Sequence, residues 1–498
     1  MNAPSFWKRE TIARPLRPHQ VKAIQMLRQS IGSGKKRVVM CLATGAGKTR
    51  LAAEIVLGAT SKGNSVCFTV PAISLIDQTV AAFENEGLHD LGVIQANHPR
   101  TDYGARVQIA SVQTLSRRGF PDTGVVVVDE CHLQFEIIKE WQRKRPETIF
   151  VGLSATPWAK GMAENWQELL TPITMQELID QGYLSPFRVF APSHPDLSGV
   201  KMTAGDYNET QLGEVMSDRK LVADVVETWL TKGEGRPTLI FAVNRAHAMH
   251  LRDEFEKVGV KMGYCDANTD LIERQFLFDQ MKRGALSGIV NIGTLTTGVD
   301  ADVRCVVMAR PTKSEMLFVQ CIGRGLRTAP GKADCIILDH ADNHERMGFV
   351  TDIHHTKLLG GKDKRHLTRK ELDEPMPKEC PACHTLKAPK VRECPVCHFT
   401  PTRQSEVEFE DGELVEITTK AVKPVKYTQE DKQRWYSELR YIAANRGRSK
   451  GWAAHCYRDK FGVWPRGMEE DLKPASLEVQ HWVKAKDIRF AKARGKAA

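Results

Sequence analysis

The chain has 498 residues, of which 41% are hydrophobic and 27% charged, and this balance excludes wholesale disorder. At about 150 residues per domain, the length predicts roughly three structural units. No apolar run approaches the roughly 20 residues that span a bilayer, and the N-terminus has no signal-peptide core, so we expect a cytoplasmic protein without a membrane partner.

The first third of the chain alternates short apolar runs with helical patterns. The runs are "RVVMCL", "SVCFTV", "VQIAS", "VVVVDE" and "IFVGLSA", between about residues 38 and 155. The alternation resumes with "PTLIFAV" (237–243) and continues through "GIVNIG", "RCVVMA" and "DCIILDH" (334–340). Continuous apolar strands separated by helices are typical of a parallel sheet covered on both faces. The sequence therefore predicts two α/β domains in series, joined through roughly residues 185–218.

The first strand runs into "LATGAGKTRLA" (42–52), a glycine-containing turn that opens a helix. Glycines let backbone N–H groups close around phosphates, and a helix N-terminus favours their negative charge. Lys48 would reach the β- and γ-phosphates, and the Thr49 hydroxyl would hold Mg²⁺. The strict P-loop pattern has a further glycine where this chain has Leu42, so a plain glycine-rich turn is the alternative. The predicted nucleotide loop consists of Thr44, Gly45, Ala46, Gly47, Lys48 and Thr49.

The four valines of "VVVVDECH" (125–132) are followed by two acids, a thiol and an imidazole. In P-loop ATPases a strand neighbouring the P-loop strand ends in an aspartate that orients Mg²⁺, a position that Asp129 fits. The adjacent Glu130 is suited to accept a proton from the attacking water. A zinc site at Cys131 and His132 fails, because neighbouring side chains on an extended segment point to opposite faces and no further Cys or His lies nearby.

Three further segments fit a nucleotide-hydrolysing site. "LSATP" (153–157) follows another strand, and its small hydroxyl residues could couple the nucleotide to motion. Gln20 in "RPLRPHQ" could read the adenine edge, with a surface glutamine as the alternative. "QCIGRGLRT" (320–328) places Arg324 and Arg327 one turn apart on a helix. Two guanidiniums from a second domain could stabilise charge on a transferring phosphate, although alone they would more often be surface arginines.

Together these motifs resemble those of superfamily 2 helicases. Gln20, "ATGAGKT", "DECH", "SAT", "TTGVD" (296–300) and "QCIGRGLR" stand in the family's order and spacing over about residues 14–345. The similarity is closest to bacterial RadD-type DNA repair helicases and more distant to the motor (Res) subunits of type III restriction enzymes. The resemblance implies ATP bound between two RecA-like domains, with nucleic acid lying across both. Cys321 departs from the family, since many relatives have an arginine after the glutamine.

The resemblance also implies a role for each matching residue. Asp129 would hold the metal, Glu130 would activate water, and Asp300 would contact the ribose, while Arg324 and Arg327 would act as fingers across the cleft. Coupling of hydrolysis to domain movement would fall to Ser154, Ala155 and Thr156. Contacts with the nucleic-acid backbone would come from Pro71, Ser111, Gln113, Thr114, Thr296 and Thr297.

Four cysteines form two Cys-x-x-Cys knuckles in "CPACHTLKAPKVRECPVC", with ten residues between the knuckles. Four thiolates complete a closed tetrahedral Zn²⁺ site, and the metal would supply the folding energy of a unit too small to have a core. A redox Cys-x-x-Cys pair is the alternative. The predicted zinc ligands are Cys380, Cys383, Cys394 and Cys397.

The last 72 residues, 427–498, hold 16 Lys or Arg against 9 Asp or Glu, which is seven of the chain's net ten positive charges. They also hold four of the nine tryptophans, and the pattern predicts helices broken at "NRGRSKG" and "FGVWPRG". Such a tail favours contact with DNA, whose phosphates attract cations and whose bases stack on aromatic rings. A folding or partner-docking module is the alternative.

The sequence thus predicts an α/β protein of two tandem RecA-like P-loop domains with parallel sheets, a zinc ribbon and a basic, mainly helical tail. The predicted boundaries are 1–184 and 185–350 for the two domains, 351–378 for a charged linker, 379–402 for the ribbon, 403–426 for a hairpin or linker, and 427–498 for the tail. The implied cofactors are ATP, Mg²⁺ and Zn²⁺. The implied partners are single-stranded or branched DNA, with single-strand-binding or repair proteins, at the nucleoid.

The predicted function is an ATP-dependent DNA helicase or translocase in repair or recombination, and two alternatives stay open. The motor of a restriction or phage-defence nuclease would need a second catalytic site, usually an Asp followed later by Glu-x-Lys. The nearest candidate has Glu416 four residues before Lys420 and does not fit. A non-motor DNA-binding or annealing scaffold would not need the intact Lys48, Glu130 and arginine pair.

Overall fold

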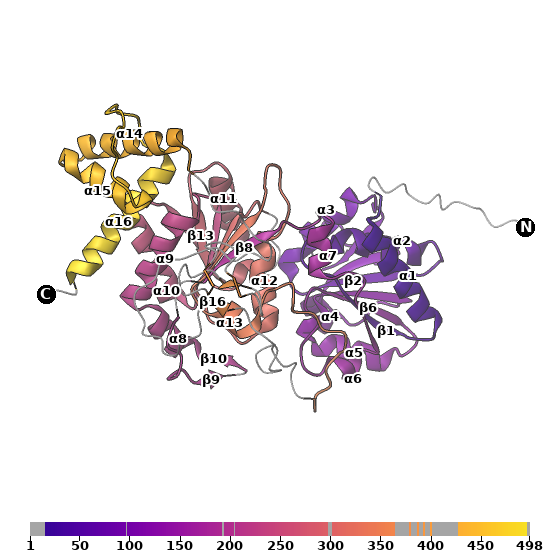
Figure 1. Ribbon diagram of the computed structural model, residues 1–498. Coiled ribbons are helices and arrows are strands. Elements are labelled where there is room, and N and C mark those ends of the chain that lie inside the picture. Colours follow the sequence, from indigo (N-terminus) through magenta and orange to yellow (C-terminus); the bar gives the residue numbers. More distant parts are fainter. Residues whose placement is uncertain are drawn as a thin grey trace, which may run out of the picture. The chain divides into compact units, whose positions relative to one another are not determined.

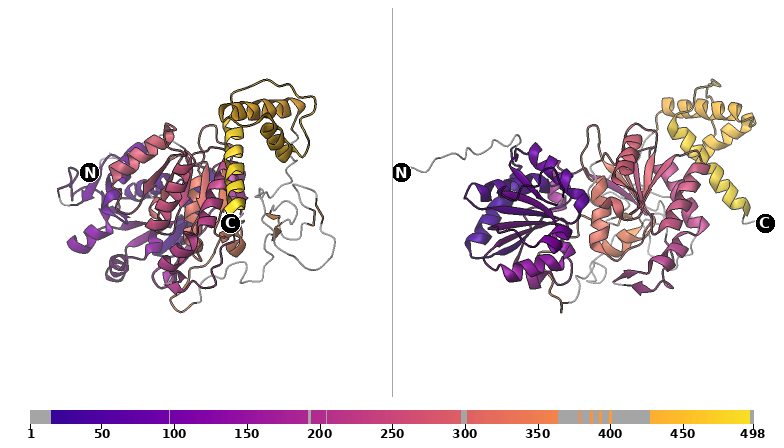
Figure 2. Two further views of the ribbon diagram at one scale, coloured as in Figure 1. Left: turned by 90° about the vertical axis from the view of Figure 1, so that its left-hand side faces the viewer. Right: turned by 180° about the vertical axis from the view of Figure 1, so that it is seen from behind.

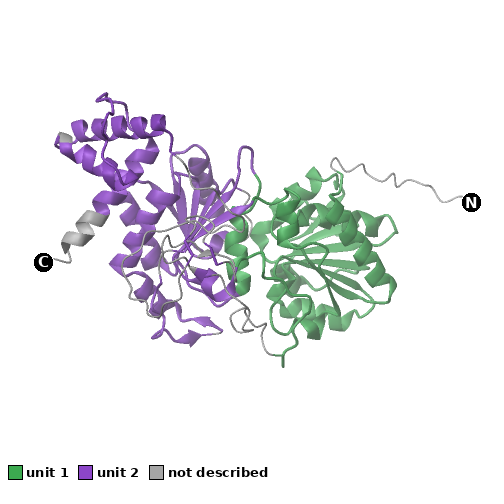
Figure 3. Cartoon of the chain, in the orientation of Figure 1, with its two compact units in different colours: residues 1–185, 315–328, 349–372 green, residues 186–314, 329–348, 373–498 purple. Residues whose placement is uncertain are grey.

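The computed structural model describes residues 15–95, 97–191, 194–203, 205–296, 301–363, 378–379, 386–387, 392–393, 399–400 and 427–495. The chain divides into two compact units (Figure 3). Unit 1 consists of residues 1–185, 315–328 and 349–372, and unit 2 of residues 186–314, 329–348 and 373–498. The division after Ser185 lies one residue from the predicted domain boundary. Two later segments, 315–328 and 349–372, belong to the same compact unit as the N-terminal residues.

Unit 1 is built on a seven-stranded sheet in the order β3-β4-β2-β5-β6-β1-β7, and every pairing in it is parallel (Figure 1). All four valines of β5 are buried, as expected for an inner strand of a sheet covered on both faces. The strands are β1 (Arg37–Cys41), β2 (Val66–Val70), β3 (Leu91–Ile94), β4 (Val107–Ser111), β5 (Val125–Asp129), β6 (Ile149–Ser154) and β7 (Glu168–Leu170).

Helices and aromatic side chains cover this sheet. Trp141 of α5 is fully buried, stacks on Phe120 at 4.9 Å between ring centroids and meets Phe150 edge-on at 5.8 Å. Such pairs add to the free energy gained by burying the rings. The helices of unit 1 are α1 (Pro18–Gly32), α2 (Lys48–Thr60), α3 (Ile76–Asn85), α4 (Val112–Arg118), α5 (Glu136–Lys144), α6 (Met162–Asn165), α7 (Met175–Asp180) and α12 (Glu315–Gly325), with short 3-10 turns η1 (Ile73–Leu75) and η2 (Cys131–Leu133).

Unit 2 contains a second parallel sheet, six-stranded, in the order β12-β13-β11-β14-β15-β8. Its strands are β8 (Phe187–Phe190), β11 (Thr238–Phe241), β12 (Met262–Cys265), β13 (Gly288–Asn291), β14 (Cys305–Met308) and β15 (Cys335–Asp339). Two short antiparallel ladders join β9 (Met202–Thr203) to β10 (Asp206–Tyr207), and β16 (Lys378–Glu379) to β17 (Leu386–Lys387).

Asparagine or aspartate caps begin four helices of unit 2, because their side chains accept the otherwise unpaired N–H groups of the first turn. The capping residues are Asn208, Asp218, Asn244 and Asp270. The helices that they begin are α8 (Glu209–Met216), α9 (Arg219–Lys232), α10 (Arg245–Lys257) and α11 (Leu271–Lys282). The remaining elements before the tail are η3 (Thr294–Thr296) and α13 (Asn343–Met347).

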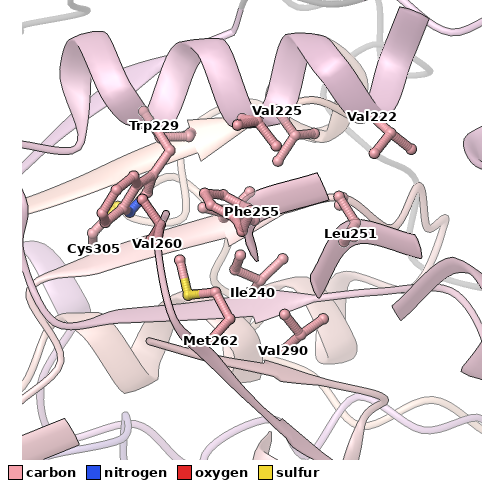
Figure 4. Packing of buried hydrophobic residues seen from close by; sticks show 14 of the residues in the cluster. Val222, Val225, Trp229, Ile240, Leu251, Phe255, Val260, Met262, Val290 and Cys305 are labelled. Carbon is pink, nitrogen blue, oxygen red and sulfur yellow. The ribbon is translucent and has the colours of Figure 1, made fainter. Parts of the chain in front are cut away.

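The core of unit 2 lies between its sheet and the helices α9 and α10 (Figure 4). Trp229 of α9 meets Phe255 of α10 edge-on at 5.5 Å, and its indole N–H donates to Thr238 Oγ1 at 2.7 Å. The one polar atom of this large side chain is therefore satisfied in the core, which removes the free-energy cost of burying it.

The tail forms three helices, α14 (Gln429–Asn445), α15 (Lys450–Phe461) and α16 (Leu477–Gly495), with breaks at the two predicted glycine-containing segments. These helices enclose a small core of their own around Trp435 and Tyr457. The long helix α16 also packs along α9, and Ala485 joins the core of unit 2 (Figure 2). Lys484 Nζ donates to the carbonyl of Val258 at 2.8 Å. One helix thus belongs to both cores.

The two predicted parallel α/β folds are confirmed, and every strand predicted from an apolar run is present. Within the two large sheets, the strands that we did not predict are the four edges: β3, β7, β8 and β12. Within the described part of the chain, every helix is too short or too polar to cross a membrane.

Candidate nucleotide-hydrolysing site

The predicted nucleotide loop connects β1 to α2. Gly45 and Gly47 have left-handed backbones (φ 86° and 81°), where a side chain would be strained. A Cβ on Gly47 would also lie 2.5 Å from Gln20 Nε2. Among the described residues no side chain caps the start of α2, so the loop can present N–H groups to an anion. Leu42, at the position of the pattern's further glycine, directly follows β1, and its N–H still donates to the Ser154 carbonyl of β6 at 2.9 Å.

Asp129 ends β5, Glu130 follows it directly, and both carboxyl groups lie near Lys48 of the loop. Lys48 Nζ lies 3.1 Å from Glu130 Oε1, and both side chains are largely buried, with 21% and 15% of their surface exposed. Glu130 has a left-handed backbone (φ 48°), which is unusual for a residue with a side chain and orients it away from the strand direction. We expected the acids to end the strand next to β1, and this was wrong, because β6 lies between β1 and β5.

Burial and neighbouring charges separate the two carboxyl groups. Burial raises the pKa of Asp129 to about 6, against the opposing charge of Lys48. Burial would also raise the pKa of Glu130, but the charge and hydrogen bond of Lys48, together with the charge of Arg324, outweigh it and lower that pKa. Glu130 Oε2 is buried, accepts no hydrogen bond within the described part of the chain, and lies 3.4 Å from His132 Nδ1. The site therefore combines a buried aspartate suited to a cation with a charged glutamate whose Oε2 can accept a hydrogen bond from water.

His132 joins the acids to the segment after β6. Its Nδ1 is hydrogen-bonded to Ser154 Oγ at 2.8 Å, and the same Oγ accepts from the Thr156 N–H at 3.1 Å. Burial lowers the pKa of His132, which favours the neutral ring that this contact uses. Gln320 Nε2 of α12 donates to Thr156 Oγ1 at 3.0 Å and lies 3.5 Å from His132 Nε2. The predicted coupling residues Ser154 and Thr156 thus connect Glu130 to α12.

Helix α12 brings a positive charge to the same place. Arg324 is only 6% exposed, and its charge contributes to the lowered pKa of Glu130. Gly323 allows the close approach, because a Cβ there would lie 3.1 Å from the Thr44 side chain. The predicted arginine is therefore held against the nucleotide loop within unit 1.

Arg327 does not share this helix, so the expectation of two arginines one helical turn apart is wrong. α12 ends at Gly325, and Arg327 instead forms an isolated antiparallel bridge with Leu184. The Ser185 N–H also donates to the Leu326 carbonyl at 2.7 Å, which draws this segment into extended backbone. The stem of Arg327 still approaches the loop, since a Cβ on Gly45 would lie 3.9 Å from its Cγ.

Gln20 fastens the start of α1 to the nucleotide loop. Its Oε1 accepts from the Arg17 N–H at 2.9 Å, and its Nε2 donates to the carbonyls of Ala46 and Gly47 at 3.3 and 3.1 Å. Its amide is therefore used within the protein on both sides, and its contact with adenine stays a prediction.

Predicted nucleic-acid contacts gather at one edge of the sheet. β2 and β4 pair with Val70 opposite Ser111, so Pro71 and the start of α4 lie at adjacent strand ends. Ser111 and Thr114 are buried, and the Ser111 hydroxyl caps α4 by accepting from the Thr114 N–H at 3.1 Å. Gln113, between them, is exposed. Only Gln113 of these three therefore presents its side chain to solvent.

Several predicted residues lie outside the described residues: Thr297, Asp300, Cys380, Cys383, Cys394, Cys397 and the possible hairpin at 403–426. Thr296 ends η3, and its side chain is outside that description as well. Their assigned roles stay predictions.

Two residues of the site were not identified from the sequence. The sequence offers His132 only as a possible zinc ligand, and it places Gln320 in the arginine-containing motif without indicating a role. The usable signal was position, since His132 follows the acids directly and Gln320 lies four residues before Arg324. Neither signal shows contact, because the two side chains are 188 residues apart in the chain.

Two known protein families match the two segments of the chain that contain the residues of this site. Residues 14–159 match the family "Type III restriction enzyme, res subunit", and residues 220–329 match "Helicase conserved C-terminal domain". The first match contains Lys48, Glu130 and Thr156, and the second contains Gln320 and Arg324.

Relatives that align with about two thirds of this chain agree with these matches. The chain is 29% identical over 363 residues to "Putative ATP-dependent helicase IRC3" of Saccharomyces cerevisiae, covering 67% of this chain and 52% of that protein. It is 26% identical over 355 residues to the "51.5 kDa protein" of Lactococcus phage (isolate 7-9), covering 69% and 73%. The chain thus spans about half the length of the yeast relative.

A solved structure shares the fold. A fragment of "a putative HsdR subunit of a type I restriction enzyme" from Vibrio vulnificus YJ016 matches with a TM-score of 0.54 at 21% identity, over 70% of this chain and 69% of that one. The fold and the family matches together define a helicase-type architecture, in which a Res-type domain is followed by a helicase C-terminal domain. These matches support the resemblance to superfamily 2 helicases with a Res-type motor.

Proposed function

We propose that this protein is a DNA-dependent ATPase that moves along DNA, a helicase or translocase acting in repair or recombination at the nucleoid. One observation carries the proposal: Lys48, Glu130 and Thr156 are connected to Gln320 and Arg324 of α12 through hydrogen bonds and charge. If bound nucleotide only stabilised the fold, no connection between α12 and the proposed water-activating residue Glu130 would be needed.

ATP and Mg²⁺ fit the residues of this site. Uncapped N–H groups at the start of α2 and the Lys48 ammonium suit phosphates, and the buried Asp129 carboxyl suits a divalent cation together with the exposed Thr49 hydroxyl. When bound, Mg²⁺ supplies charge to neutralise phosphate oxygens. Glu130 would accept a proton from water at Oε2, which accepts no hydrogen bond in the described part of the chain, and Arg324 would stabilise negative charge on phosphate.

Coupling to movement would use the chain of contacts from Glu130 to α12. A change in the charge balance at Glu130 alters the environment of His132, which shares Ser154 Oγ with the backbone of Thr156. Gln320 would then transmit the change to the segment that carries Arg324. We propose that the two RecA-like domains, at predicted boundaries 1–184 and 185–350, close and open in this way.

We further propose a structural Zn²⁺ held by Cys380, Cys383, Cys394 and Cys397. The described residues before and after the first knuckle, Lys378–Glu379 and Leu386–Lys387, form a short antiparallel ladder with Glu379 opposite Leu386. Two Cys-x-x-Cys knuckles supply the four thiolates of a closed structural zinc site.

The experiment that tests the function is ATP turnover with single-stranded, duplex, forked and branched DNA, and RNA as the control. We expect DNA, above all single-stranded or branched DNA, to raise turnover, and Lys48→Ala to abolish it with every substrate. Turnover that no nucleic acid stimulates would refute the motor and favour a DNA-binding scaffold. Strand separation is then measured separately with a fork that carries a fluorophore and quencher.

The second candidate is the motor of a restriction or phage-defence nuclease, which the match of residues 14–159 to the Res family favours. It predicts Mg²⁺-dependent cleavage of DNA by the protein, alone or with partner subunits. Cleavage by the purified chain that persists in Lys48→Ala would contradict our proposal, because a helicase has no second hydrolytic site.

A further inference from the structure

The four tryptophans of the tail have different surroundings. Trp435 is fully buried in the tail core, and Trp452 and Trp482 pack against that core. Trp464 is 42% exposed and lies in the connection between α15 and α16. Three of the four rings are therefore used for folding, and Trp464 is the one whose ring is available to a ligand.

Trp464 folds back along α15. Gly462 ends that helix in the left-handed region (φ 71°), and the chain reverses so that the Trp464 ring meets the His455 ring at 5.1 Å. The Arg458 guanidinium lies 4.6 Å from the Trp464 ring centroid. His455 and Arg458 are exposed and one helical turn apart, so the three side chains form one strip on α15. We call these three residues the α15 strip.

Positive charge in the tail lies in two stretches of the sequence, and one of them contains this strip. Residues 446–466 hold six Lys or Arg and one acid, Asp459, and residues 484–496 hold six Lys or Arg and one acid, Asp487. Asp459 lies 2.6 Å from Lys486 of α16 and 3.9 Å from Arg458, and Arg446 pairs with Asp487 at 2.8 Å. The excess of cations attracts anionic ligands to α15 and its flanking turns, as it does to the end of α16.

The chemistry of the strip selects among anionic ligands. The Arg458 guanidinium lies over the Trp464 ring, so a base can stack on the outer face of the guanidinium or on the part of the indole that stays exposed. In a duplex the base faces are covered by neighbouring pairs, so a duplex can use only the phosphates. An acidic protein segment would match the charge but would leave the flat surfaces without a specific partner.

We propose that the α15 strip binds single-stranded nucleic acid, with a base stacked on Trp464 and Arg458 and with phosphates contacting the cations of residues 446–466. The proposal rests on the proposed function for the choice of DNA as the natural ligand. The strip would provide a second binding site for a single strand. This site lies in the tail, whose helix α16 packs against α9 of unit 2.

The test measures affinity of the full-length protein, without nucleotide, for a fluorescein-labelled oligothymidylate of about 20 nucleotides, with duplex DNA and RNA of the same length for comparison. Trp464→Ala should weaken binding of the single strand about 5- to 150-fold, the range for one lost stacking contact. Trp464→Phe should restore most of the affinity because it keeps a flat ring. Trp464→Leu should behave like Trp464→Ala.

Matched controls separate the strip from general effects. Leu477→Ala removes another exposed apolar side chain of the tail, 67% exposed, and Lys473→Ala removes a cation outside the strip. Neither should change affinity for the single strand appreciably. Arg458→Ala should reduce the slope of log affinity against log salt by about 0.7. Thermal unfolding of Trp464→Ala should match wild type, since the ring is not part of the core.

Several results would overturn the proposal. Unchanged affinity in Trp464→Ala, or full affinity in Trp464→Leu, would exclude stacking. Polyglutamate serves as the probe for an acidic protein partner. The strip would be assigned to such a partner if polyglutamate displaced the oligonucleotide from the wild-type protein and bound Trp464→Ala more weakly than wild type. Failure of the proposed function is distinguishable, because it appears as wild-type ATP turnover that no DNA stimulates, while the binding measurement needs no ATP.

Discussion

Replacing Glu130 by glutamine changes one charge at the centre of the site and leaves its shape intact. Glu130 Oε1 lies 3.1 Å from Lys48 Nζ, so the lysine that should reach phosphates is engaged by the acid when no nucleotide is present. A nucleotide must therefore compete with Glu130 for Lys48. Glutamine removes this competition and also removes the acceptor for the water proton.

The geometry sets the size of both effects. At 3.1 Å and an effective dielectric constant of about 20, the attraction between Lys48 and Glu130 is about 5 kcal/mol before desolvation. Desolvation offsets most of it, because both side chains are largely buried, and a net of about 0.5–1.5 kcal/mol remains. We therefore expect Glu130→Gln to bind ATP about 2- to 10-fold more tightly. Loss of the general base should lower turnover about 10²- to 10⁴-fold.

The assay pairs a binding titration with a fluorescent ATP analogue and phosphate release in the presence of single-stranded DNA. Glu136→Gln is the control, because it makes the same chemical change at a side chain of α5 that is 73% exposed, and it should alter neither quantity. Turnover of Glu130→Gln within a few-fold of wild type would remove Glu130 from the base role. Weaker ATP binding would show that the ion pair with Lys48 does not oppose the nucleotide.

Three further results are expected. Gln320→Ala removes the hydrogen bond to Thr156, so DNA-stimulated turnover should fall about fivefold, the effect of one net hydrogen bond, while ATP affinity stays unchanged. An about fivefold loss of ATP affinity would instead assign Gln320 to nucleotide binding. Burial lowers the pKa of His247 to about 3, and its Nδ1 accepts from the Val243 N–H, so the folded protein binds fewer protons than the unfolded chain between that pKa and about 6.5. The free energy of unfolding of unit 2 should therefore fall as pH drops below about 6.5, by up to about 1.4 kcal/mol per pH unit, and His247→Gln should reduce this slope in urea titrations at pH 7.5 and 5.5. Metal analysis should find one Zn²⁺ per chain that Cys380→Ser releases without changing ATP affinity, and wild-type protein free of zinc would exclude the ribbon.

The inner strands were predictable because burial on both faces leaves a continuous apolar run. β5 and β14 show it, with every valine of "VVVV" and of "CVVM" buried. The edge strands were missed for a related reason. β3 ("LGVI") and β12 ("MGYC") each contain a glycine, and β8 ("FRVF") contains an arginine that pairs with Asp334, so none forms a plain β-branched run. An edge strand pairs with a neighbour on one side only, so its sequence need not form the continuous apolar run that identifies an inner strand.

The sequence also predicted those site residues whose position depends on the local backbone. Lys48 and Glu130 stand where a strand ends, at a turn whose shape glycine or a left-handed residue sets, and their pairing at 3.1 Å follows from the shared edge of a parallel sheet. The tail tryptophans show the opposite case. Their number suggested stacking on bases, but composition does not report burial, and the fold uses Trp435 for its core.

The sequence by itself determined two parallel α/β folds, the nucleotide loop and the acids, because each depends on neighbours within a strand or a turn. Only the tertiary structure decided that Gln320 reaches Thr156 and His132, that Arg327 leaves the helix to bridge Leu184, and that Trp464 alone of its group faces solvent. Those contacts join residues more than 100 positions apart or depend on which face of a helix is covered. Periodicity along a chain records whether a side chain is buried, and it carries no information about the partner that buries it.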